Sequence, residues 1–177
     1  SPINSFIPED NVSYELSIIY NNEIFKGITT KSKTPNFINV KQGDNTLFSG
    51  EETEVVVEFQ DDESKENYYL IDFSKNLYLT IEDRFFNGSD YNFSFFFQED
   101  EIELPEDIIV KMSGITKDYH TYFRVLSNQS GQSGGGPFQT TPSSLLGNIV
   151  NTTYSENFPL GYFHIAETAT YFLSLTE

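Results

Sequence analysis

Residues 53–60 read TEVVVEFQ, and this stretch decides the fold class. Val55, Val57 and Phe59 stand at every second position, with the polar residues Glu54 and Glu58 set against them. Successive side chains of a β-strand point to opposite faces, so strict alternation predicts a strand that buries one face. We therefore expect the three apolar side chains in the core and the two glutamates on the other face.

Short alternating stretches recur on both sides of residues 53–60. The predicted strands span residues 14–20, 23–26, 68–73, 77–81, 92–98, 107–113, 161–166 and 170–175. Phe93, Phe95 and Phe97 form the inward set of one of them. Asn21-Asn22 separates the first two stretches, and because asparagine tolerates positive φ this pair predicts a tight hairpin. Short strands joined by polar turns are typical of a β-sandwich or barrel.

One segment has a helical period instead. Its apolar residues are Ile115, Tyr119, Tyr122, Phe123 and Leu126, spaced as one face of a helix. We predict a helix near residues 116–128, with Thr116 as its N-cap and Asp118 favourably placed in the first turn. The aromatic stripe is interpreted as core packing against the sheet, not as a ligand site.

The composition excludes several classes of protein. The chain has 27 Asp and Glu against 10 Lys and Arg, a net charge of −17, which repels nucleic acid and anionic lipid. It has no cysteine, so disulfides, zinc–thiolate sites and cysteine nucleophiles are ruled out. No stretch approaches the roughly 18 apolar residues that a membrane-spanning helix needs.

No catalytic residue, metal site or cofactor is predicted. His120 and His164 have no fixed carboxylate partner in the sequence, so we interpret both as structural. Two acidic clusters, residues 61–63 and 99–107, lack the D-x-D-x-D-G spacing of a calcium loop, and solvated turns are the favoured interpretation. A carboxylate pair for glycoside hydrolysis stays open, because such a pair comes together only in three dimensions.

The segment 127–148 is long, polar and without periodicity. Loops of this kind are functional or lack fixed structure. The residues predicted to bind a ligand or partner are Gly134, Gly135, Gly136, Pro137 and Phe138. The glycines allow close backbone approach, and Phe138 would be the apolar anchor. In the alternative interpretation, Phe138 folds back onto the helix as a plug.

The helix and the segments after it resemble a known family. The stretch Tyr119-His120-Thr121-Tyr122-Phe123-Arg124-Val125-Leu126-Ser127 is followed by Gly134-Gly135-Gly136-Pro137-Phe138, then Asn148-Ile149 and Gly161-Tyr162-Phe163. This succession resembles the C-terminal part of the domain of unknown function 4249 family of Bacteroidota cell-envelope lipoproteins. Upstream matches at residues 59–61, 67–69 and 83–88, and the hairpin from Tyr14 to Phe25, extend the resemblance over nearly the whole chain.

The resemblance implies a domain organisation. Residues 1–45 are expected to end an immunoglobulin-like β module that is truncated at its N-terminus. Residues 50–177 are expected to form a β-sandwich-like main domain containing the helix. Family members begin with a lipoprotein signal, a lipidated cysteine and several strands, so the chain is expected to be a fragment of such a protein.

The resemblance also implies a function. It is a non-enzymatic accessory binding or scaffolding role in an outer-membrane lipoprotein of the cell envelope, anchored only through its lipid. The expected partner is a TonB-dependent outer-membrane receptor in nutrient uptake, or a surface ligand. The rival hypothesis is a cell-envelope hydrolase that acts on glycans or peptides through a carboxylate pair.

Overall fold

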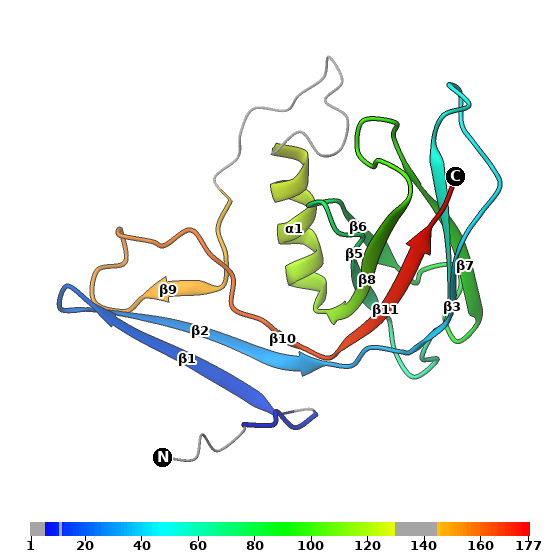
Figure 1. Cartoon of the computed structure of the whole chain (residues 1–177). Helices are drawn as coiled ribbons and strands as arrows, with labels where there is room; N and C mark the ends of the chain where they lie inside the picture. Colours follow the sequence, from blue (N-terminus) through cyan, green and yellow to red (C-terminus); the bar gives the residue numbers. More distant parts are fainter. Residues whose placement is uncertain (1–5, 11, 130–144) are drawn as a thin grey trace, which may run out of the picture. The chain divides into compact units, whose positions relative to one another are not determined.

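The computed structural model describes residues 6–10, 12–129 and 145–177. Within these residues the chain is mainly β, with three sheets and one helix, α1 (Lys117–Gln129). The predicted fold class is thereby confirmed (Figure 1). The chain divides into two compact units that are each discontinuous in sequence. Unit 1 comprises residues 1–33 and 115–167, and unit 2 comprises residues 34–114 and 168–177. The predicted modules, 1–45 and 50–177, stay a prediction.

Unit 2 is a β-sandwich. One sheet has the order β3-β4-β7 and the other the order β11-β8-β5-β6. Their strands are β3 (Phe37–Gln42), β4 (Thr53–Gln60), β5 (Tyr68–Asp72), β6 (Tyr78–Glu82), β7 (Asp90–Phe97), β8 (Glu106–Ile115) and β11 (Thr168–Leu175). The pairs β3–β4, β4–β7, β5–β6 and β8–β11 are antiparallel.

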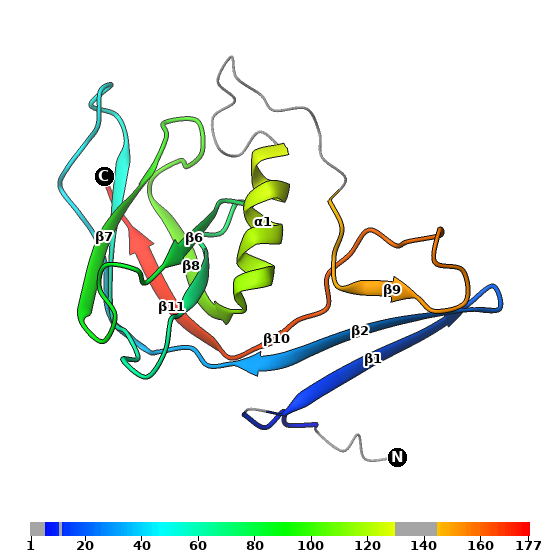
Figure 2. The ribbon, with the colours of Figure 1, turned by 180° about the vertical axis from the view of Figure 1, so that it is seen from behind.

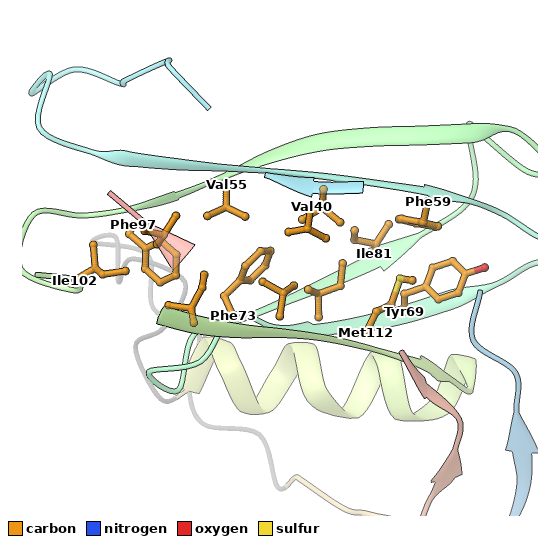
Figure 3. Close-up of a cluster of buried hydrophobic side chains, with 14 residues drawn as sticks. Val40, Val55, Phe59, Tyr69, Phe73, Ile81, Phe97, Ile102 and Met112 are labelled. Carbon is orange, nitrogen blue, oxygen red and sulfur yellow. The ribbon is translucent and has the colours of Figure 1, made fainter. Parts of the chain in front are cut away.

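The core of unit 2 lies between its two sheets (Figure 3). Val55, Val57 and Phe59 of β4 have no solvent exposure, which confirms the alternation predicted for residues 53–60. Phe97 is also fully buried, whereas Phe93 and Phe95 are partly buried and pack against the same core. The apolar face of each sheet is therefore removed from water by the other sheet, the arrangement that defines a sandwich.

Unit 1 is built on a β-hairpin. β1 (Ser13–Tyr20) and β2 (Glu23–Ser32) are joined by Asn21 and Asn22, whose φ angles are 48° and 63°. The predicted hairpin turn is therefore confirmed. β9 (Ile149–Asn151) pairs antiparallel with β2, as both ribbon views show, and β10 (Ile165–Ala166) pairs with it in parallel (Figures 1 and 2). β1 is an edge strand of this sheet.

The helix begins where the sequence predicts. The Thr116 hydroxyl accepts a hydrogen bond from the Tyr119 backbone N–H at 3.1 Å, so Thr116 is the N-cap. The stripe is less buried than expected: Tyr119, Tyr122 and Phe123 are only half-buried, and Leu126 is 39% exposed. His120 is the buried side chain of the helix.

Candidate functional site

The five residues predicted to bind, Gly134, Gly135, Gly136, Pro137 and Phe138, lie outside the described residues. Their predicted role stays a prediction. The described residues of each unit carry other candidate surfaces.

Two of the segments that carry the family resemblance meet in unit 1. The Asn148 amide oxygen accepts a hydrogen bond from the Phe163 N–H at 2.7 Å, and its NH₂ group donates to the Phe163 carbonyl at 2.8 Å. The same NH₂ group donates to the Ile28 carbonyl of β2 at 2.9 Å. Asn148 thus joins residues 161–163 to the hairpin. Its side chain makes hydrogen bonds to backbone groups that a neighbouring strand would otherwise make.

The backbones cross closely at this point. A Cβ atom on Gly147 would lie 1.5 Å from the Gly161 carbonyl oxygen, a distance that no side chain can occupy. Only glycine at position 147 allows the approach that brings Asn148 to the Phe163 backbone.

The aromatic residues of the helix pack on the next part of this segment. The Tyr119 ring stacks on the His164 imidazole, with ring centres 4.3 Å apart and planes 22° apart, and also contacts Tyr162 at 4.9 Å. Tyr122 contacts Tyr162 at 5.1 Å. Burial lowers the pKa of His164, so this imidazole is neutral at pH 7 and packs as an aromatic ring. The arrangement holds a helix on a loop and leaves no exposed nucleophile–base pair within it.

The other side of the hairpin carries exposed apolar side chains. Ile19 of β1 lies directly opposite Ile24 of β2, and Val150 of β9 lies opposite Lys26. Alternation along β2 places Ile28 on the same face as Ile24. We call Ile19, Ile24, Ile28 and Val150 the hairpin face; they are 77%, 39%, 60% and 56% exposed.

Hydrogen bonds from the segment after β9 hold the sheet that carries the hairpin face. The Thr152 N–H and hydroxyl both donate to the Ile24 carbonyl, at 2.8 and 3.0 Å, and the Ile24 N–H donates to the Thr153 hydroxyl at 3.0 Å. Lys26 forms an ion pair with Glu15 at 2.8 Å within the same face. The face therefore presents fixed aliphatic side chains around one neutralised charge pair, which suits contact with an apolar partner surface.

Sequence comparison adds a family to this geometry. The sequence model of a domain of unknown function (DUF4249) matches residues 1–171. The chain belongs to the DUF4249 family. No curated protein and no solved structure matches the chain. As its name says, the activity of this family is unknown, so the residues alone must support a function.

In unit 2 the first acidic cluster contributes to a buried carboxyl pair. Asp61 and Asp83 are 5% and 1% exposed, and the charge of Asp61 acts on Asp83. Asp61 accepts hydrogen bonds from the Tyr69 hydroxyl and from the Gly88 N–H, the latter at 3.0 Å. Asp83 accepts from the Asn67 N–H at 2.7 Å. The sequence could not show this pair, because its two members are far apart along the chain.

Asp83 favours its protonated form more than an exposed aspartate does. Among the described residues, no donor reaches the buried Oδ1 of Asp83. Burial, together with the charge of Asp61, raises the pKa of Asp83. Burial also raises the pKa of Tyr69, whose hydroxyl donates to the pair. A glycosidase pair must reach its substrate, and this one is enclosed by protein.

The second acidic cluster lines an open hollow of about 920 Å³ in unit 2. Its walls are residues 99–106 with Lys75, whose ammonium group pairs with Glu106. Within the described residues, no group of three or more acidic or histidine side chains is arranged to hold a metal ion. No helix in the same residues has the length and apolar character of a membrane span.

Proposed function

We propose that this protein is a non-enzymatic binding or scaffolding domain of a cell-envelope lipoprotein. Its lipid anchor would hold it at the outer membrane, where it would work with a TonB-dependent transporter in nutrient uptake. Membership of the DUF4249 family is compatible with this role but does not specify it.

The hairpin face is the observation that carries the proposal. Four aliphatic side chains stand exposed on one face of a sheet whose strands are fixed by backbone pairing. Burying each of them on a partner would contribute on the order of 1–2 kcal/mol. A contiguous exposed apolar patch is typical of an interaction surface.

The rival hydrolase hypothesis finds less support. The carboxyl pair that folding assembles, Asp61 and Asp83, is enclosed and hydrogen-bonded on both sides. A screen with glycoside and peptide substrates tests the rival directly. Turnover that disappears when one carboxylate is replaced would establish it.

The binding role is tested by co-purification from membranes with a TonB-dependent receptor of the same organism. The variant carries Ile19→Thr and Ile28→Thr, which keep β-branched side chains in the strands but remove the apolar surface. The matched control is Phe172→Thr, a change at another strand residue, 76% exposed, in unit 2. We expect the receptor to be recovered with the parent and the control and lost with the double variant. Equal recovery with all three would remove the hairpin face from the interaction, and no recovery with the parent would remove the receptor.

A further inference from the structure

The loop of residues 43–52 connects β3 to β4 in unit 2, and its tip is apolar (cyan in Figure 1). Phe48 is 107% exposed, so its ring has no cover from the protein, and Leu47 beside it is 46% exposed. An exposed phenylalanine on a surface loop costs solubility and contributes nothing to the core. Packing within the fold therefore does not explain why apolar side chains stand at this tip.

The loop tip is held in one conformation by a glutamate. The Glu52 carboxylate accepts hydrogen bonds from the backbone N–H groups of Leu47, Ser49 and Gly50, at 3.0, 3.2 and 3.2 Å. Burial alone would raise the pKa of Glu52, but hydrogen bonds from the Ser49 side chain and from backbone N–H groups, including those of Leu47 and Ser49, lower it to about 2. The carboxylate stays charged at physiological pH and keeps its three donors.

A second glutamate fixes the base of the loop. Glu54 is 2% exposed and accepts hydrogen bonds from the Asn45 N–H at 2.9 Å, from the Asn45 amide group and from the Ser94 hydroxyl. A Cβ atom on Gly43 would lie 2.0 Å from the Glu54 carboxylate, so the chain passes directly over it. Two buried carboxylates thus organise the whole loop, and little conformational entropy remains to be lost when Phe48 binds.

The surroundings of the tip are acidic. Thr53 lies opposite Phe97 in the β4–β7 pair, so the loop 43–52 and the hollow of residues 99–106 lie at the same end of that pair. The acidic residues of the hollow are Glu99, Asp100, Glu101, Glu103 and Glu106, and the loop itself adds the exposed Asp44 and Glu51. Lys75, the cation of the hollow, is engaged by Glu106.

We propose that Leu47 and Phe48 form a recognition tip that inserts into an apolar pocket of a protein partner with a basic rim. A rigid aromatic side chain is the usual anchor of such a contact, and the acidic residues around it select positive charge. A second copy of this chain would bring acid against acid, and anionic lipid would be repelled in the same way. The proposal rests on the proposed binding function but not on the hairpin face, which belongs to unit 1.

Position-specific photo-crosslinking tests the proposal in the cells that make the protein. The photoreactive amino acid p-benzoylphenylalanine replaces Phe48 in one variant and Phe85 in the control. Phe85 is 92% exposed in the same unit, in the turn before β7, and thus at the opposite end of the β4–β7 pair. A third variant carries the probe at Ile28 and reports on the hairpin face separately.

We expect position 48 to give a protein adduct that position 85 does not give. Mass spectrometry of this adduct should identify a partner peptide that carries apolar residues beside Lys or Arg. Replacing Glu99, Asp100 and Glu103 by their amides should abolish or strongly reduce that adduct. The proposal is overturned if position 48 gives no more adduct than position 85. Crosslinks to lipid, to a second copy or to a peptide without basic residues, or an adduct indifferent to the amide substitutions, overturn it as well. Adducts from position 28 alone would support the binding function and reject the tip.

Discussion

Replacing Asp83 by asparagine should remove a pH dependence from the stability of this protein. The pKa of Asp83 is raised from its ordinary value of 3.8, first by burial and then by the charge of Asp61. The folded state therefore holds a proton that the unfolded chain has released. Stability from this group is fully present below pH 3.8 and is lost as the pH rises toward the raised pKa.

The size of the effect follows from the proton count. One proton held only by the folded state changes the free energy of unfolding by about 1.4 kcal/mol per pH unit. Asparagine has nearly the shape of aspartate: its amide oxygen can accept from the Asn67 N–H, and its NH₂ group can donate to Asp61 without a proton from solvent. Asp83→Asn should therefore gain stability over the parent as the pH rises, by up to about 1.4 kcal/mol per unit, until the parent pair ionises.

Urea unfolding followed by far-ultraviolet circular dichroism, from about pH 4 to about pH 8, measures this difference. Other groups also titrate, including Glu66, which faces the pair, Glu52 and Glu54, whose pKa values are lowered, and His164. The contributions of groups that do not interact with Asp83 cancel when the variant is compared with the parent at each pH. Asp107→Asn, at an exposed carboxylate of the same unit, is the matched control and should run parallel to the parent. Parallel curves for Asp83→Asn, or a parent that gains on the variant as the pH rises, would refute the raised pKa of Asp83.

Two further substitutions test the packing of each unit. Phe73 is fully buried in unit 2 and stacks on Phe95 with ring centres 3.9 Å apart. Phe73→Ala should therefore lower the free energy of unfolding, measured in urea, by about 3–5 kcal/mol. The control Phe172→Ala, at an exposed ring, should change it by less than about 0.5 kcal/mol. Asn148→Ala removes three hydrogen bonds to backbone groups in unit 1 and should cost about 1–3 kcal/mol and speed hydrogen exchange at the Phe163 amide; unchanged exchange there would show that Asn148 does not hold this segment.

The sequence pattern predicted the strands whose apolar face packs against the opposite sheet. Residues 53–60 and the phenylalanines of β7 alternate because one face meets the opposite sheet, and that requirement is visible in the residues themselves. The cap at Thr116 was equally visible, since it depends on a local hydrogen bond. Local and periodic constraints leave a record in the sequence, so these elements were correctly placed.

Two segments differ from prediction for identifiable reasons. Residues 37–42 are absent from the predicted strands, yet Phe37–Gln42 forms β3, because a bulge between Phe37 and Asn39 breaks the period of two that marks a strand. Residues 161–166 were expected to be a strand, yet only Ile165–Ala166 pairs as one, because the Phe163 backbone bonds to the side chain of Asn148 instead.

The candidate surfaces were harder to predict. Glu54 was expected on the open face of its strand, but loop 43–52 covers it, and that loop's own conformation depends on the buried carboxylate. The exposure of Phe48 follows from the same loop. A residue's environment here is set by a contact between segments, so neither periodicity nor composition reveals it.

Among the described residues, those that carry the family resemblance have structural roles. The Asn148 amide is used on the backbones of Phe163 and Ile28, and the His164 imidazole is stacked on Tyr119. A side chain whose polar groups are already satisfied within the fold has little left to offer a ligand. In this chain, Asn148 therefore serves to join residues 161–163 to the hairpin. Specificity should then reside in side chains that the fold does not use, and the hairpin face and the tip at Phe48 meet that condition: they are exposed, apolar and fixed by their neighbours.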